Sequence, residues 1–121
     1  MLSTDFKQLF KDFAGIKIGV IGDVMLDTYW WGQVERISPE APVPVVQVNR
    51  KEQRIGGAAN VALNLSSLGA PVTIFSVLGE DEDGVILTDL LNEHRINTAY
   101  LLKTDSRITT NKMRVISRNQ Q

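Results

Sequence analysis

The sequence predicts an α/β fold built on parallel strands, and three observations support this prediction. Short segments that are apolar on both faces, at 16–21 and 72–78, are typical of strands inside a parallel sheet. These segments alternate with helical patterns, as in consecutive βαβ units. The chain has 121 residues, 43% of them hydrophobic, which suits one globular domain or one large part of a domain.

Composition and charge exclude several classes of function. The 13 Lys and Arg residues against 14 Asp and Glu give a net charge of -1, which does not indicate a nucleic-acid partner. There is no cysteine, so disulfides and thiolate metal sites are excluded. The apolar stretches are much shorter than the roughly 20 residues that span a bilayer, and the N-terminus lacks the apolar run of a signal peptide. We therefore expect a cytoplasmic protein without a membrane partner.

An amphipathic helix is expected near the N-terminus, because apolar residues recur at positions i, i+3, i+4 and i+7. Ser3 or Thr4 is expected to cap this helix and Gly15 to end it, and the helix should pack on the domain edge. The apolar positions are Phe6, Leu9, Phe10 and Phe13.

The segment after the first strand has a different character. Strands are expected at 29–37 and 43–49, interrupted by Pro39, Pro42 and Pro44, and proline belongs at strand starts or edges. Trp30 and Trp31 are adjacent, so in a strand they point to opposite faces. We interpret this segment as a flap that stands off the main body.

The rest of the chain continues the alternation of helices and strands. A helix at 58–68 closed by Gly69, a strand at 72–78, a helix capped by Asp83, and strands at 97–102 and 109–119 are expected. After the N-terminal helix the predicted order is β, flap, α, β, α, β, β. The chain stops without a turn or cap signal, which we interpret as a truncation.

Three groups of residues are candidates for binding. Gly56 and Gly57 precede the helix at 58–68, where the backbone can approach a ligand and free N–H groups suit hydroxyl or phosphate oxygens. Asn60 adds an amide suited to sugar hydroxyls. A tight turn with ordinary packing is the alternative explanation of the two glycines.

Asp23 and Asp27 follow the first strand, and ligands of open α/β sheets bind beyond the carboxyl ends of strands. A carboxylate there accepts hydrogen bonds from vicinal hydroxyls, although a turn aspartate that caps nearby backbone is an alternative.

Lys112, Arg114 and Arg118 share one face of the last expected strand and could meet a phosphate monoester, or simply form a solvated face. His94 is the only histidine, which leaves no second imidazole for a zinc site. The glycine fingerprints of dinucleotide sites and of phosphate loops are both absent.

One motif goes further than these patterns. The run Gly56-Gly57-Ala58-Ala59-Asn60-Val61-Ala62, followed by six residues to Gly69 and nine more to Gly79, resembles the N-terminal signature of the ribokinase (PfkB) carbohydrate kinases. Segments 22–30, 36–46 and 114–121 resemble the kinase domain of the heptose-7-phosphate kinases, which occur alone or fused to a nucleotidyltransferase. The resemblance covers about residues 10 to 121.

This resemblance implies the N-terminal part of a ribokinase-like three-layer α/β/α fold, spanning residues 1–121, with a small β-lid at about 29–55 and 109–121. It implies transfer of a phosphoryl group from ATP, with Mg²⁺, to the anomeric hydroxyl of heptose 7-phosphate, a step toward the lipopolysaccharide core. Carried over by position, the sugar site comprises Asp27, Gly57, Ala58 and Asn60. The residues expected to bind the substrate phosphate and ring oxygens are Lys112, Arg118 and Asn119.

The catalytic Gly-Ala-Gly-Asp motif of this family has no counterpart in the 121 residues. We therefore expect no catalytic residue, metal or bound cofactor in this chain, and no kinase activity from it alone. A homodimer is expected, through the lid or through the cut edge of the sheet. Other kinases of the family, acting on ribose, fructose or adenosine, and a non-catalytic module that dimerises are the alternatives.

Overall fold

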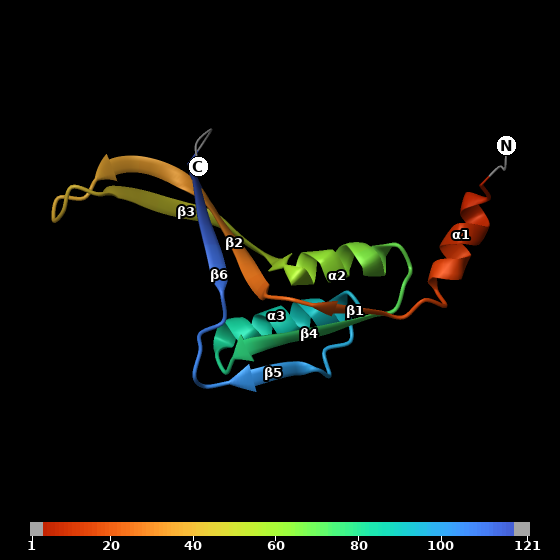
Figure 1. Cartoon of the computed structure of the whole chain (residues 1–121). Helices are drawn as coiled ribbons and strands as arrows, with labels where there is room; N and C mark the ends of the chain where they lie inside the picture. Colours follow the sequence, from red (N-terminus) through yellow and green to blue (C-terminus); the bar gives the residue numbers. More distant parts are fainter. Residues whose placement is uncertain (1–3, 118–121) are drawn as a thin grey trace.

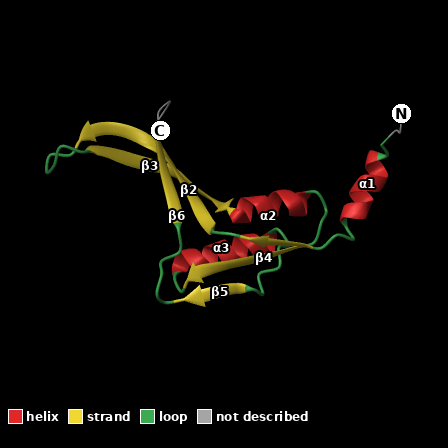
Figure 2. Ribbon diagram, in the orientation of Figure 1, coloured by secondary structure: helices red, strands yellow, loops and turns green. Residues whose placement is uncertain are grey.

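The computed structural model describes residues 4–117, apart from the side chains of 35–37. These residues form two sheets (Figures 1 and 2). One is parallel with the order β1–β4–β5, where β1 is Ile18–Ile21, β4 is Val72–Gly79 and β5 is Leu101–Thr104. The other has the order β3–β2–β6, where β2 is Val24–Ile37, β3 is Pro44–Gly57 and β6 is Asn111–Ser117. The predicted α/β class is therefore confirmed.

Helices α2 (Ala58–Ser67) and α3 (Glu82–Glu93) pack on one face of the parallel sheet. Ala59 and Ala62 are fully buried, because small side chains let α2 lie close to the strands. The opposite face of the sheet presents Ile21, Phe75 and Leu102 to solvent. Within residues 4–117, no helix is long and apolar enough to cross a bilayer. The core consists of Val24, Ile55, Ala59, Ala62, Val72, Ile74, Leu78, Leu87, Leu91 and Ile96.

The second sheet stands off the α/β layer, as Figure 1 shows, and we call it the lid (β2, β3 and β6). β2 and β3 form a long antiparallel hairpin, and β6 runs parallel to β2. The sequence predicts shorter hairpin strands, whereas β2 begins at Val24 and β3 continues to Gly57. The hairpin is longer because Val24, Leu26 and Ile55 are buried, so both strands are rooted inside the domain.

The starts of two helices correct the prediction. Asp5, rather than Ser3 or Thr4, caps α1 (Phe6–Phe13), and Asp81, rather than Asp83, caps α3. Each carboxylate accepts a hydrogen bond from the amide three residues ahead, at 3.1 Å and 2.8 Å respectively. This spacing satisfies one of the free N–H groups at a helix start, and aspartate does so as well as serine or threonine.

The N-terminal helix α1 is amphipathic as expected, but only its last residue, Phe13, packs on the domain edge. No residue of α1 is buried, and Phe6 is 65% exposed. Figure 1 shows the helix set apart from the two sheets. Phe13 is half-buried, beside an apolar hollow of about 230 Å³ that it lines with Ile16, Ile18, Leu65, Leu68 and Ala70.

The third parallel strand begins later than predicted, at Leu101 instead of Asn97. Asn97 makes only an isolated bridge to Thr73, and its side-chain oxygen accepts a hydrogen bond from the Ala99 amide at 3.0 Å. The Leu101 amide then donates to the Thr98 carbonyl, 3.2 Å away. These local bonds form a turn that delays the strand.

A polar network joins the lid to α3. The buried Thr28 hydroxyl on β2 donates to the side-chain oxygen of Asn111 on β6, at 2.7 Å, and accepts from Gln53 on β3, at 3.4 Å. The Asn111 amide in turn donates to Asp83 on α3, at 3.1 Å. The network therefore ties all three lid strands to the first turn of α3.

A second set of bonds fixes the segment that enters β6. The Thr109 amide donates to the Asp81 carboxylate, at 2.8 Å, and the buried Thr109 hydroxyl accepts from the Gly79 amide, at 2.9 Å. The hydrogen bonds from Thr109 and Gly84 hold the pKa of the Asp81 carboxyl below its ordinary value. Both sets of bonds secure the lid at its root.

The link between Asn111 and Asp83 can be tested by exchanging the two side chains. Asn111→Asp places two carboxylates against each other and should lower the free energy of unfolding by about 1–3 kcal/mol. Adding Asp83→Asn restores a donor to the pair and should recover most of the loss. Urea unfolding of the two single variants and the double variant measures the coupling, and additive effects would contradict the network.

Candidate functional site

Asp27 lies on β2 at the root of the lid. In the register of the sheet it is opposite Arg54 on β3 and Lys112 on β6, so the three side chains project from the same face. The Asp27 side chain is 15% exposed, and Lys112 Nζ lies 3.5 Å from its Oδ1. Among the described residues, this buried Oδ1 has no hydrogen-bond partner. A mostly buried carboxylate oxygen that has a cation nearby but no hydrogen bond is well suited to accept one from a ligand.

Gly56 makes room for this carboxylate. A Cβ at Gly56 would lie 2.8 Å from the carboxyl carbon and both oxygens of Asp27. Gly57 has φ of +62°, and a Cβ there would lie 2.5 Å from the Asp23 carbonyl oxygen. That carbonyl accepts from the Ala58 amide at 2.8 Å. The two glycines therefore let β3 pass Asp27 closely and turn directly into α2, whose first residue bonds to Asp23.

The first turn of α2 holds the other residues of the predicted sugar site. Gly57 is its N-cap and makes no side-chain cap bond, and Ala58 is half-buried against Gly22. Asn60 is exposed and borders a hollow of about 180 Å³. The hollow is lined by Gln53, Arg54, Ile55, Asn60, Leu63, Leu90 and His94.

Asp27 does not line the hollow that Asn60 borders. The two residues share Arg54 as a neighbour, because it is opposite Asp27 in the sheet and also lines the hollow of Asn60. The structure thus places Gly56 against Asp27 and places Gly57 and Ala58 against Asp23, just before β2, and it connects Asn60 to Asp27 through Arg54.

The cationic face predicted on the last strand is present on β6. Lys112 and Arg114 project from the same face as Asp27, and Arg114 donates a hydrogen bond to the Tyr29 hydroxyl at 2.8 Å. Arg118 and Asn119, also predicted to bind substrate, lie outside the described residues.

A stack of side chains on the same face was not predicted. Arg54 lies over the Tyr29 ring, Tyr29 stacks on Trp31, and Arg50 lies over Trp31. Trp30 points to the other face, under Lys51, which confirms the expected opposition of the two tryptophans. We call this arrangement the lid stack (Tyr29, Trp31, Arg50 and Arg54). Its sequence signal is the period of two in 27–31 and 50–54, which becomes visible only if β3 is extended to Gly57.

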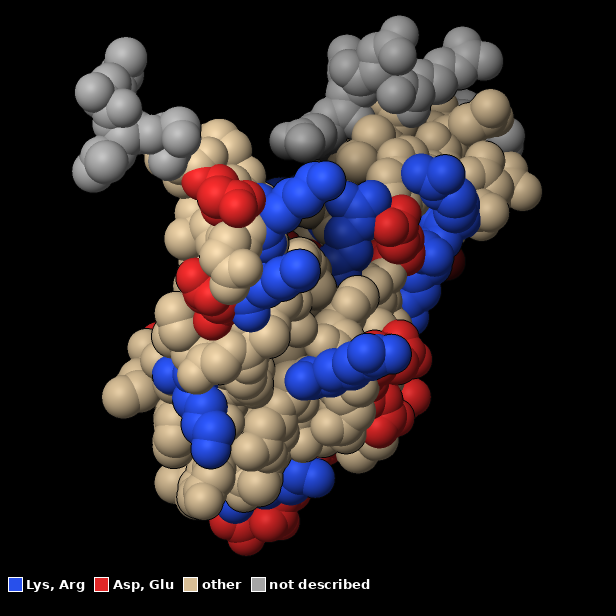
Figure 3. All heavy atoms as spheres, turned by 90° about the vertical axis from the view of Figure 1, so that its right-hand side faces the viewer, with Lys and Arg blue, Asp and Glu red and all other residues tan. Residues whose placement is uncertain are grey.

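Charges gather on this part of the molecule. Four cations and two carboxylates project from the Asp27 face of the lid: Arg50, Arg54, Lys112, Arg114, Asp27 and Glu52. Figure 3, which views the molecule from the side of α1, shows Lys and Arg side chains in the upper half with Asp and Glu side chains among them. The hydrogen bond from Arg54 lowers the pKa of the Glu52 carboxyl. This face therefore favours an anionic ligand.

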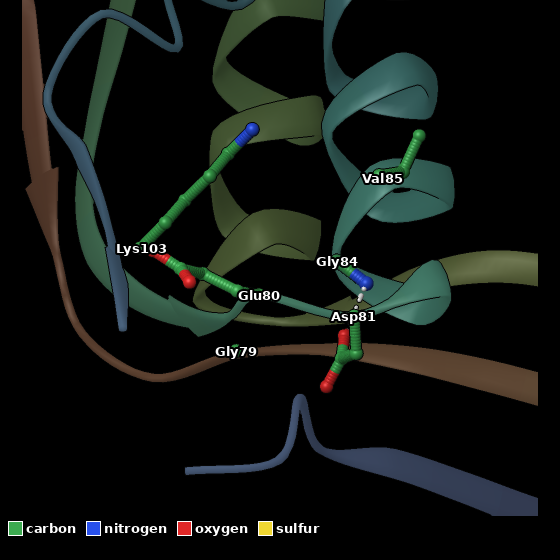
Figure 4. Close-up of a pocket in the computed structure, with 6 residues that line it drawn as sticks. All are labelled: Gly79, Glu80, Asp81, Gly84, Val85 and Lys103. Carbon is green, nitrogen blue, oxygen red and sulfur yellow. Dashed lines mark hydrogen bonds between the residues drawn. The ribbon is translucent and has the colours of Figure 1, made fainter. Parts of the chain in front are cut away.

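Another pocket, of about 380 Å³, lies where β4 ends and α3 begins (Figure 4). Its Asp81 carboxylate is already engaged by the Gly84 and Thr109 amides, and the Lys103 side chain extends away from it. Within residues 4–117, no group of three or more His, Asp or Glu side chains could hold a metal ion. This pocket therefore offers less to a ligand than the root of the lid.

The fold and the site define a class. The resemblance to the ribokinase-type carbohydrate kinases implies a parallel α/β sheet with a lid. It also implies a sugar site at a lid carboxylate and a Gly-Gly turn into a helix, and the structure contains the sheet, the lid, the carboxylate and the turn. A family model described as "pfkB family carbohydrate kinase" matches residues 16–121. The chain belongs to this family.

Relatives and solved structures agree with this assignment. The chain is 53% identical over 108 residues to a D-beta-D-heptose 7-phosphate kinase of Bordetella bronchiseptica, covering 89% of this chain and 34% of that protein. It is 50% identical over 114 residues to the bifunctional protein HldE of Actinobacillus pleuropneumoniae, covering 94% and 24%. The chain thus spans about a quarter to a third of these relatives.

Solved structures of carbohydrate kinases resemble the chain. A carbohydrate kinase from Agrobacterium tumefaciens aligns with a TM-score of 0.70 at 24% identity, covering 86% of this chain and 32% of that one. A fructokinase of Halothermothrix orenii aligns with a TM-score of 0.62 at 28% identity, covering 87% and 35%. The ribokinase-like fold is therefore confirmed.

Proposed function

We propose that this chain forms the sugar-binding part of a kinase that phosphorylates heptose 7-phosphate at O1 with ATP. The observation that carries the proposal is the Asp27 carboxylate, mostly buried, with one oxygen lacking a donor, beside the Gly56-Gly57 turn and the start of α2. Sugar hydroxyls supply such donors. The named heptose 7-phosphate kinase among the relatives supports the choice of sugar.

Different residues of the site are proposed to bind different parts of the substrate. Asp27 accepts hydrogen bonds from vicinal hydroxyls, while Gly57, Ala58 and Asn60 line the sugar at the helix start. Lys112, together with Arg118 and Asn119, is assigned to the substrate phosphate and ring oxygens. The partial positive charge of the α2 N-terminus adds to the attraction for oxygen atoms.

ATP and Mg²⁺ belong to this proposal as co-substrate and cofactor, and with them a cytoplasmic location, where ATP is available. When bound, they supply the phosphoryl group and neutralise its charge. The described residues offer no cluster of three metal-binding side chains. The part proposed for this chain is therefore to bind and orient the sugar.

The assignment of Asp27 predicts a selective loss of sugar binding. Asp27→Asn removes the charge of the acceptor and should weaken the binding of heptose 7-phosphate about 10- to 100-fold in calorimetry. Asp23→Asn is the matched control, because Asp23 is a nearby exposed carboxylate outside the Asp27 face. Equal affinity of the wild type for ribose and heptose 7-phosphate would contradict the proposed substrate.

A second prediction concerns catalysis. Phosphoryl transfer depends on positioning and on stabilising charge on the transferred group, and the family's Gly-Ala-Gly-Asp motif is missing from the 121 residues. We expect the purified chain to release no ADP from ATP in the presence of heptose 7-phosphate, measured by a coupled assay. Sugar-dependent turnover would show that the chain carries a catalytic group of its own.

We also propose that two copies of the chain associate through the lid. Met113 and Val115 on the outer lid strand β6 are exposed, which leaves an apolar edge strand in water. Light scattering should give a dimer, and Met113→Glu should shift the mass toward the monomer. A monomer at all concentrations would disprove the association.

A further inference from the structure

The lid stack is continuous from the Asp27 end of the lid toward its tip. Arg54 Cζ lies 4.8 Å from the centroid of the Tyr29 ring, and Arg50 Cζ lies 3.8 Å from that of Trp31. The two aromatic rings are 5.6 Å apart and inclined by only 19°. Guanidinium groups are attracted to aromatic faces, so each end of the stack holds an arginine in place.

Arg54 is held by more than the stack. Its Nε donates to Glu52 Oε1 at 2.6 Å, which favours one orientation of the guanidinium. The bond to Glu52 uses Nε and leaves the terminal nitrogens as a fork of donors. The Arg54 side chain is 56% exposed, so this fork is accessible to a ligand.

The position of Arg54 matters as much as its charge. It is opposite Asp27 across β2 and β3, and residues paired in this way have Cα atoms about 4.5–5.5 Å apart. It also lines the hollow that Asn60 borders. A sugar with hydroxyls on Asp27 therefore has another part within reach of the Arg54 fork.

The other cation beside Asp27 is placed differently. Lys112 Nζ lies 3.5 Å from the Asp27 carboxylate, so its charge compensates the group that receives the sugar hydroxyls. A lysine is also a point charge, whereas the planar arginine fork matches two oxygens of a phosphate at once.

We propose that Arg54 binds the phosphate of a phosphorylated sugar together with the residues already assigned to it, and that its planar fork determines the preference of this site for a sugar phosphate over the free sugar. The inference rests on the proposed function, because it needs the sugar to sit on Asp27. Glu52 and Tyr29 act as positioning residues for the guanidinium.

Calorimetry on the whole chain with two probes, heptose 7-phosphate and the unphosphorylated heptose, tests this role. Arg54→Gln should weaken binding of the phosphorylated sugar about 10- to 100-fold and change binding of the free sugar less than about twofold. Arg54→Lys keeps the charge without the fork and should fall between the wild type and Arg54→Gln.

Arg50→Gln is the matched control. It removes the same charge from the other end of the lid stack, away from Asp27, and should leave the preference for the phosphorylated sugar unchanged. Circular dichroism and thermal unfolding of each variant verify that the fold is retained.

The possible outcomes separate this inference from the proposed function. If Arg54→Gln keeps the wild-type preference, weakens both sugars equally, or matches Arg50→Gln, Arg54 does not determine the preference and the inference is overturned while the sugar site stands. If the wild type binds neither sugar, the proposed function fails and the inference fails with it.

Discussion

Strand β2 is shared between the core and the lid, and its alternation imposes the arrangement of the site. Val24, Leu26 and Thr28 are buried against the α/β layer, which anchors one face of the strand. Successive side chains of a strand point to opposite faces, so Asp27 and Tyr29 must project from the other face. A slip of one residue in this register would bury the carboxylate and expose the core. The apolar contacts of β2 therefore place Asp27.

The position of Asp27 is well defined only if the root of the lid is held rigidly on the α/β layer. Thr28 and Asn111 connect neighbouring strands, and Asp83 extends the connection to α3. Because the Thr28 hydroxyl is buried, leaving it without a partner would cost about 1–3 kcal/mol, which favours a single register of the strands. Lys112 follows Asn111 directly, so the same network fixes where its side chain meets Asp27.

Several parts of the candidate site were predictable from sequence because they depend on residues that are close together in the chain. The glycine pair and the helix that follows it are adjacent in the chain, and Asp27 comes soon after a recognisable buried strand. Arg54 and Glu52 were missed because the run 50–54 is charged and looks like a loop, while its strand character comes from pairing with β2. The prediction for α1 differed from the structure for a similar reason, since an amphipathic pattern does not say which surface will cover the apolar face of the helix.

The uncovered face of the parallel sheet has a consequence for how the chain behaves in water. Ile21, Phe75 and Leu102 leave apolar side chains exposed on the face opposite the helices, around a depression of about 530 Å³. Each Å² of apolar surface removed from water is worth about 25 cal/mol, and this contribution is not gained on that side of the sheet. The colloidal stability and shelf life of the chain thus depend on what shields this face. A detergent or a hydrophobic dye should bind to it.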